Sequence, residues 1–199
     1  MAADKIKEAE NERKCRELID KGQFYQAARI MEEYRTPLHD YMGKGPLNLD
    51  HDLEAIYKMY EKFPEQLRNL SAEYYVPARK ELAYEFLRGN NTIRKYMNKP
   101  TNIPGMTVGI AMIIMLNRAC QLRDIDRYKN SGVCIGVEII AAGDMCPECK
   151  KICGKYSWND DIPALPNPKC KKSSPCLPIM NAIVGVEKPT KKKGLFGLF

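Results

Sequence analysis

The sequence predicts an α+β protein with a mostly helical body and a small C-terminal cysteine-rich, zinc-ribbon-like β module. Apolar residues recur at helical spacing over roughly the first 130 residues, whereas five of the eight cysteines lie between Met145 and Cys176. A hydrophobic fraction of 44% in 199 residues is enough for a genuine core. We therefore expect a helical domain over 1–130, a cysteine-rich module with short strands over 131–186, and a flexible basic and apolar tail over 187–199.

Helices are expected throughout the first domain because apolar side chains recur there every three or four residues. The segments on either side of Lys21-Gly22, within residues 4–35, predict a helical hairpin. The second of these helices carries its apolar stripe on Phe24, Ala27, Ala28, Met31 and Tyr34. After a loop-like segment over 36–48, Asp50 is placed to cap a helix with an apolar face formed by Leu53, Ile56, Tyr57 and Tyr60.

Prolines and glycines set the expected boundaries of the remaining helices. Pro64 and Pro77 are each expected in the first turn of a helix, and Gly89 is expected to end the second one. A short helix is expected over 93–97. After a break at 99–105, an apolar helix is expected from Met106 to about Arg123.

The pattern changes from helices to strands after Asn130. The run VCIGVEIIA is apolar and β-branched, which is typical of a strand. Tyr156 and Trp158 indicate a second short strand, and residues 179–186 indicate a third. The intervening IPALPNPK has too many prolines for a helix or a central strand, so it is expected to be an extended loop.

Charge and hydropathy restrict the class of protein. A formal net charge of +7 and a pI near 8.9 permit contact with nucleic acid or anionic lipid without requiring either. The polar start MAADKIKEAENERK lacks the apolar stretch of a secretory signal, and the longest apolar run is much shorter than the roughly 20 residues that cross a bilayer. We therefore expect a cytoplasmic protein, in which structural disulfides are uncommon.

The segment MCPECKKICGKYSWNDDIPALPNPKCKKSSPC has the spacing of a metal site. Its Cys-x-x-Cys pair lets two thiolates face one ion, and tetrahedral zinc needs a second pair, typically about 20 residues further on. Few large apolar residues lie in this segment, so a structural zinc ion would replace the missing core. The expected zinc ligands are Cys146, Cys149, Cys170 and Cys176, with Cys153 as the alternate.

Two other interpretations of the cysteines remain open. The segment can keep its fold without metal, with reduced or occasionally oxidised thiols, or Cys146 and Cys149 can form a thiol–disulfide redox centre. The cysteines outside the segment follow helix or strand patterns and are expected to be buried small hydrophobes: Cys15, Cys120 and Cys134. The histidines are expected to be surface residues rather than ligands: His39 and His51.

The sequence favours a role through contacts with other macromolecules. It contains no glycine-rich phosphate loop, no paired catalytic carboxylates and no histidine cluster, so a non-enzymatic protein with a protein partner and no small-molecule substrate is expected. The alternative is a nucleic-acid-binding protein that uses the module's lysines with Tyr156 and Trp158.

The C-terminal stretch KKKGLFGLF is the expected interaction tail. A basic run followed by four apolar side chains suits a groove on a partner protein and, more weakly, an anionic membrane surface. The residues of this tail are Lys191, Lys192, Lys193, Leu195, Phe196, Leu198 and Phe199.

The region 105–180 resembles the C-terminal cysteine-containing module of tailed-phage head morphogenesis (minor capsid) proteins. In that family a helix and a strand lead to an Asp, a Cys-x-x-Cys pair, a Gly-Lys, an acidic spacer and a Pro-rich stretch that ends in cysteines. The matching positions are Val137–Ile140, Asp144, Cys146, Cys149, Gly154, Lys155, Asp160, Asp161, Pro163, Leu165, Pro166, Cys170 and Cys176.

This resemblance departs from the family at its end. The family pattern closes with His-Pro-Asn-Cys-Arg-Cys, whereas this chain has Pro-Asn-Pro-Lys-Cys, no histidine and a longer gap to Cys176. The resemblance implies a phage- or prophage-type protein with a head-morphogenesis-like role, which would place it in the virion if it is a structural protein.

Overall fold

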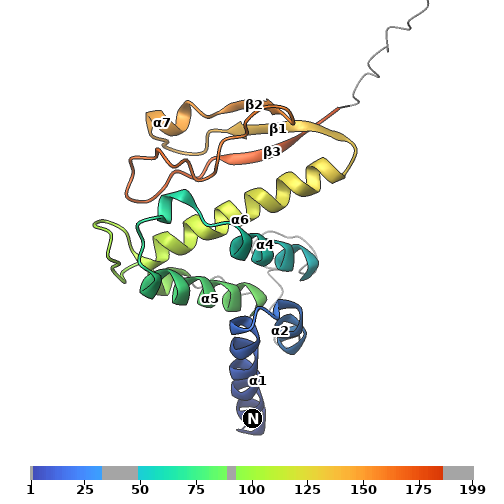
Figure 1. The fold of residues 1–199 in the computed structure, drawn as a ribbon, viewed down its shortest axis with the longest axis vertical. Coiled ribbons are helices and arrows are strands. Elements are labelled where there is room, and N and C mark those ends of the chain that lie inside the picture. The colour runs from blue at the N-terminus through green and yellow to red at the C-terminus, as the bar shows by residue number, and fades with distance from the viewer. Residues whose placement is uncertain (1, 33–48, 89–92, 186–199) are drawn as a thin grey trace, which may run out of the picture.

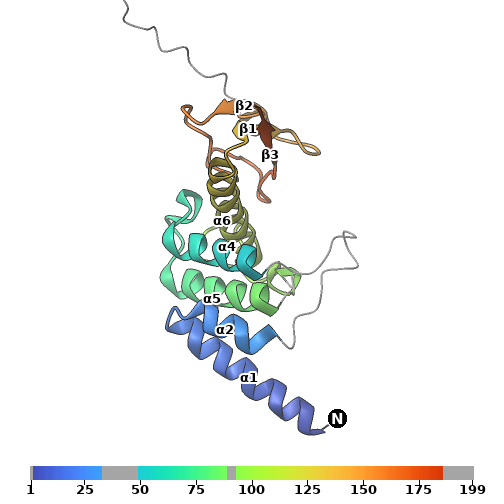
Figure 2. The same cartoon turned by 90° about the vertical axis from the view of Figure 1, so that its right-hand side faces the viewer.

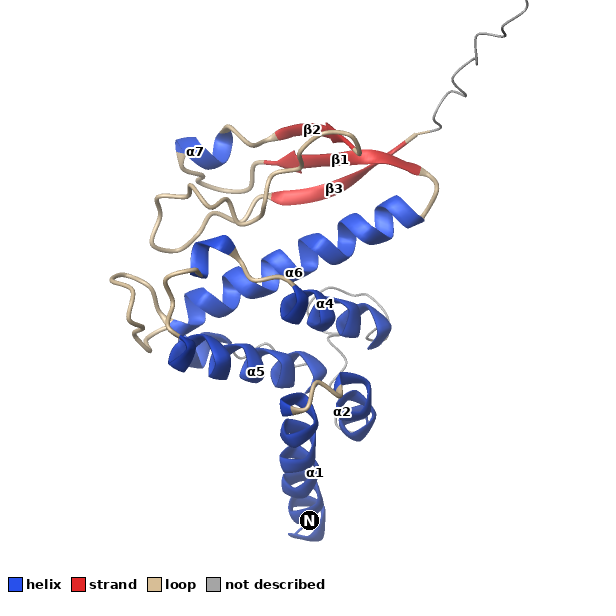
Figure 3. Cartoon of the chain, in the orientation of Figure 1, coloured by secondary structure: helices blue, strands red, loops and turns tan. Residues whose placement is uncertain are grey.

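The chain forms a mostly helical α+β fold that ends in a small antiparallel sheet and a cluster of cysteines. The computed structural model describes residues 2–32, 49–88 and 93–185 (Figure 1). Figure 3 shows that the strands gather at one end of the molecule and the first helix of the chain at the other. The helical elements are α1 (Ala2–Asp20), α2 (Phe24–Met31), α4 (Leu49–Glu61), η2 (Glu65–Leu67), α5 (Ala72–Arg88), η3 (Ile93–Tyr96), α6 (Val108–Asn130) and α7 (Pro147–Lys150).

The hairpin of α1 and α2 follows the predicted pattern. Gly22 adopts a positive φ of 71°, and its N–H donates to the carbonyl of Ile19 at 3.0 Å, so the first helix ends where the glycine allows the chain to turn. The apolar stripe of α2 is buried as predicted at Phe24, Ala27, Ala28 and Met31. Tyr34, the loop over 36–48 and Gly89 lie outside the described residues.

The predicted start of α5 was wrong. The helix begins at Ala72, so Pro77 lies inside it rather than in its first turn. The N–H groups of Tyr74 and Tyr75 both donate to the carbonyl of Ser71, which gives the helix an earlier first turn. Burial of Tyr75 at 6% exposure anchors that turn, and this tertiary contact outweighs the local preference of proline.

The long helix α6 extends further than predicted. Thr107 caps its start by accepting a hydrogen bond from the Ile110 N–H at 3.2 Å, and the helix continues past Arg123 to Asn130. Its charged last turns form ion pairs with α4, at 2.6 Å between Lys58 and Asp126 and 3.1 Å between Arg127 and Glu54. The apolar pattern stops near Arg123 because these turns contact α4 through charges.

The sheet has the order β2-β1-β3, with both pairings antiparallel. Three strands were predicted and three are present among the described residues, although their boundaries differ by one or a few residues. Trp158 lies just beyond the second strand, and the third ends before residue 186, which lies outside the described part of the chain. The strands are β1 (Cys134–Ile140), β2 (Gly154–Ser157) and β3 (Ile179–Val184).

The Pro-rich loop between β2 and β3 fastens the sheet to the helical body. Gln121 of α6 is 3% exposed; its Nε2 donates to the carbonyl of Pro163 at 2.7 Å, and its Oε1 accepts from the Leu165 N–H at 2.8 Å. Gln66, the middle residue of η2, donates to the carbonyl of Pro166. In Figure 2 the helices are stacked from α1 and α2 through α5 and α4 to α6, and the sheet covers α6 at the far end.

Candidate metal centre

The sheet register brings two loops of the module to one place. Ile139 pairs with Gly154 and Ile140 with Ile179, so β1 ends where β2 and β3 begin. The connection from β1 to β2 contains α7, which lies at this end of the sheet in Figure 1. The connection from β2 to β3 returns to the same end. Each connection contributes two cysteines to the thiol cluster, which we define as Cys146, Cys149, Cys170 and Cys176.

The thiol cluster has the dimensions of a tetrahedral metal site. Its four sulfur atoms lie within 4.8 Å of one another, and the sulfurs of Cys146 and Cys170 are 3.9 Å apart. Four thiolates at 2.3 Å from one zinc ion would be separated by about 3.8 Å, so no pair of sulfurs is more than about 1 Å wider apart than that spacing. A disulfide requires about 2.05 Å, and all eight cysteines are free thiols. The cluster can therefore hold one metal ion.

Backbone N–H groups point at the sulfurs of the cluster. Hydrogen bonds from the N–H groups of Lys171 and Cys149 lower the pKa of the Cys146 thiol to about 6. The N–H of Cys146 donates to the sulfur of Cys176 at 3.3 Å, and the N–H of Cys176 donates to the sulfur of Cys170 at 3.4 Å. The donors at Cys146 and Cys176 favour the thiolate form, which is the form that binds metal.

Two of the other thiols, Cys149 and Cys176, do not ionise as readily in the absence of a cation. Burial raises the pKa of Cys149, and its hydrogen bonds with Cys146 and Cys170 raise it further. Burial also raises the pKa of Cys176. Because closely packed thiolates repel one another, a bound cation has to displace the remaining protons, and metal affinity will increase with pH.

Lysines surround the thiol cluster and balance the charge that four thiolates would carry. A zinc ion with four thiolates has a net charge of −2, and nearby cations reduce the electrostatic penalty. Two of the lysines form ion pairs at 2.8 Å, Lys151 with Glu148 and Lys172 with Asp144. Exposed lysines of the two loops also include Lys150, Lys169 and Lys171.

Cys153, the predicted alternate ligand, lies outside the group of four. Its thiol donates to the carbonyl oxygen of Cys149 at 3.5 Å, and its side chain packs against the cluster. Met145 is the one other buried hydrophobic member of this small core, at 3% exposure. The centre of the module is therefore built from sulfur atoms.

The remaining thiols were predicted to be buried, and only one of them is. Cys15 is fully buried in the helical core, where desolvation raises its pKa to about 12. Cys120 and Cys134 are only partly buried, because each lies near the boundary between the helical body and the sheet. His51 is also partly buried, with its Nε2 at 3.8 Å from Asp124, whereas His39 lies outside the described residues.

Two buried amides near the site were missed from the sequence. Asn167 is 5% exposed and donates to the carbonyl of Glu148, between the first two cysteines, at 2.9 Å. Gln121 holds the loop that leads to Asn167. Burial of Gln121 could have been predicted from helical periodicity, because this residue lies seven residues after Ile114 on the buried face of α6. Asn167 lies in an irregular loop, where periodicity gives no signal.

The predicted interaction tail, from Lys191 to Phe199, lies outside the described residues. Among the helices that are described, none has the length and apolar content to cross a bilayer.

Comparisons with protein-family models, curated proteins and solved structures find no match to this chain. The fold and the thiol cluster thus define the class of protein, an α+β protein with a four-cysteine candidate metal site.

Proposed function

We propose that the chain is a non-enzymatic protein of phage or prophage type, in which a structural zinc ion holds a small module that makes protein contacts. The observation that carries this proposal is the group of four cysteine sulfurs within 4.8 Å of one another. Four soft thiolates in a tetrahedral arrangement favour zinc, and a four-cysteine shell leaves no open position for catalysis. The head-morphogenesis-like role rests on the resemblance over residues 105–180.

The metal part of the proposal is tested by elemental analysis of the full chain purified without chelators. About one zinc per chain is expected, and Cys146→Ser or Cys170→Ser should lower zinc binding at least tenfold because each removes a thiolate ligand. Cys153→Ser is the matched control, since this thiol lies outside the group of four and its loss should leave the zinc content unchanged. Chains that contain no zinc after refolding with zinc would contradict the proposal.

The thiol–disulfide alternative is addressed by the same variants. A redox centre at Cys146 and Cys149 would require an accessible attacking thiolate. The lowered pKa of Cys146 is compatible with that chemistry, but Cys149 is fully buried and its pKa is raised. We expect no difference between the wild-type chain and Cys146→Ser in the reduction of a disulfide substrate. A loss of turnover in the variant would favour the redox function.

Two observations support a nucleic-acid role: the exposed lysines of the two metal-site loops, and the cation–π contact between Lys129 and Trp158 at 5.6 Å. Binding of single-stranded DNA or RNA would then fall steeply with salt, and Lys169→Ala combined with Lys171→Ala would reduce the salt slope by about 2. Fluorescence anisotropy over a salt series measures this directly. Absence of affinity near physiological ionic strength would rule out the nucleic-acid role.

A further inference from the structure

The two edges of the sheet are protected to different degrees. The β2 edge is four residues long and carries the exposed Lys155, both of which discourage pairing with another strand. The β3 edge has six residues with the sequence IMNAIV, without charge or proline. Ile179 is 52% exposed and Val184 is 73% exposed. Within the described residues β3 pairs only with β1, so one edge of its backbone remains open.

On the exposed face of the sheet, one polar row of side chains crosses the three strands between two positions at which β3 carries isoleucine. The polar row runs from Lys155 through Glu138 to Asn181. The neighbouring rows end on β3 with isoleucine, where Ile140 pairs with Ile179 and Gly136 pairs with Ile183. A partner strand on β3 would therefore need a polar residue opposite Asn181 and apolar residues on either side.

The opposite face of β3 turns toward α6. Met180 pairs with Ile139 and Ala182 with Val137, and both β1 residues are buried. Met180 also lines a cavity of about 110 Å³ together with Asn117 and Gln121 of α6. A partner strand would thus need small or apolar residues on this face as well.

We propose that β3 pairs with β3 of a second copy of this chain, antiparallel, about a two-fold axis that passes through Asn181. The axis is perpendicular to the sheet, so each face of one copy continues into the same face of the other. Asn181 then lies opposite Asn181 of the second copy, Ile179 opposite Ile183, and Met180 opposite Ala182. Each of these three pairings joins residues of similar chemistry, and the two sheets become one sheet of six strands.

The neighbouring symmetric registers do not fit. A two-fold axis through Met180 places Ile179 opposite Asn181, and an axis through Ala182 places Asn181 opposite Ile183. Each of these mismatches sets an amide against an aliphatic side chain. None of these three registers sets one charge of β3 against a like charge, because IMNAIV is uncharged, which matters for a chain with a net charge of +7. The seam, by which we mean the contact between the two β3 strands, contains no cysteine. The two thiol clusters lie at its opposite ends.

The self-association is tested on the zinc-loaded full chain by light scattering and sedimentation. The wild-type chain is expected to have twice the monomer mass of 22.8 kDa. Asn181→Lys and Asn181→Asp should each weaken dimerisation at least tenfold, because like charges then face each other across the seam. Mixing the two variants should restore the dimer, since a lysine would lie opposite an aspartate. Such rescue is expected only if Asn181 of one copy lies opposite Asn181 of the other.

The matched control is Ser157→Lys, which adds the same charge at the β2 edge on the same face of the sheet. This variant should remain dimeric. Zinc content and Trp158 fluorescence of each variant show whether the module is still folded, so a dimer lost through unfolding is distinguished from a dimer lost at the seam. A monomeric wild-type chain at all concentrations tested, a dimeric Asn181→Lys, or a mixture that stays monomeric would each overturn the proposal.

Discussion

At the scale of single residues, Asn167 connects the two halves of the thiol cluster. Its side-chain amide donates to the carbonyl of Glu148 in the first loop at 2.9 Å. Its side-chain oxygen accepts from the Lys169 N–H, and its backbone carbonyl accepts from the Cys170 N–H, both at 2.9 Å in the second loop. One buried side chain thus fixes the distance between the loops that carry the cysteines.

Replacing Asn167 with alanine is expected to weaken zinc affinity by about 10- to 100-fold while leaving all four cysteines in place. Zinc affinity falls because, without the Asn167 hydrogen bonds, part of the free energy of zinc binding would be used to order the second loop. Competition with a chromophoric chelator measures the affinity. Asn159→Ala is the matched control, since Asn159 is exposed. Equal affinities for wild-type chain and Asn167→Ala would show that this amide does not position the ligands.

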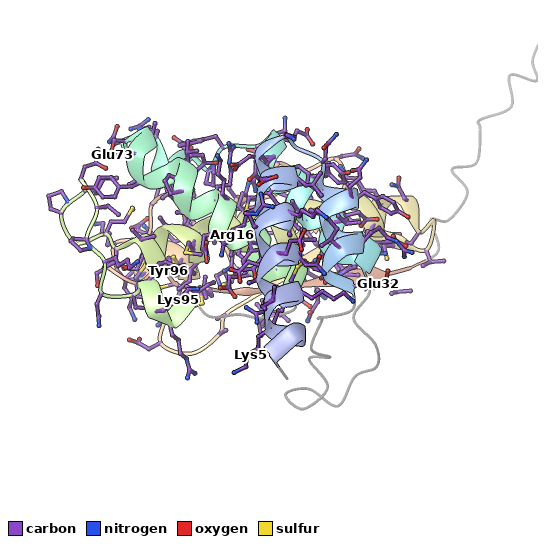
Figure 4. The ribbon with its side chains drawn as sticks, turned by 90° about the horizontal axis from the view of Figure 1, so that it is seen from below. Lys5, Arg16, Glu32, Glu73, Lys95 and Tyr96 are labelled. Carbon is purple, nitrogen blue, oxygen red and sulfur yellow. The ribbon has the colours of Figure 1, made fainter. Side chains whose placement is uncertain are left out.

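At the scale of elements, Glu81 on α5 joins three parts of the helical body. Arg16 of α1 donates to its carboxylate at 2.5 Å, and Lys95 of η3 lies at 3.3 Å from it. Figure 4 shows Arg16, Lys95 and Tyr96 on the same side of the helices. Burial raises the pKa of Glu81, but hydrogen bonds from Arg16, Tyr96 and Lys95 outweigh it and hold that pKa at about 2.

The depressed pKa predicts how stability depends on pH. The ionised carboxylate stabilises the folded state at pH values above its ordinary pKa of 4.5, and this contribution is lost as the pH falls through about 2. Glu81→Gln is therefore expected to lower the free energy of unfolding by about 1–2 kcal/mol near pH 7, after allowance for the partly exposed partners.

Urea titrations of the wild-type chain and Glu81→Gln at pH 7, 4 and 2 measure this difference. The difference should shrink between pH 4.5 and pH 2. Glu65→Gln provides the control, because Glu65 is exposed and forms a single exposed pair with Arg68 at 3.8 Å. A difference that stays constant with pH would exclude the ion pair as its cause.

At the scale of the whole molecule, the helical body and the sheet are stabilised in different ways. The body has a continuous apolar core contributed by all of its long helices, whereas the buried cluster next to α7 consists of Met145 and cysteines. The sole tryptophan, Trp158, lies in the module and donates to the carbonyl of Cys134 at 2.7 Å. Its fluorescence therefore reports on the module and on its contact with Lys129 at the end of α6.

Removal of the metal by a strong chelator is expected to shift the emission of Trp158 to longer wavelength while most of the helical circular dichroism at 222 nm remains. The reason is that the thiol cluster has little apolar packing to replace the metal. Addition of zinc should reverse the change. Loss of both signals together would mean that the helical body depends on the module, and an unchanged emission would mean that the module folds without metal.

The agreement between sequence and structure is highest where local periodicity coincides with burial. The stripe of α2 follows from residue spacing, and the strand β1 follows from its apolar, β-branched composition. The start of α5 and the end of α6 could not be predicted in this way. Burial of Tyr75 and the ion pairs from α6 to α4 decide those boundaries, and both are contacts between segments distant in sequence.

The sequence by itself determined the α+β class, the position of the sheet after a helical body, and the cysteines that can act as ligands. These depend on residue type and spacing, which act locally. Only the tertiary structure decided that Cys146, Cys149, Cys170 and Cys176 gather while Cys153 lies outside, and that Gln121 and Asn167 hold the intervening loop. The physical reason is that strand register and buried hydrogen bonds set these distances, and neither is encoded in the spacing of the cysteines.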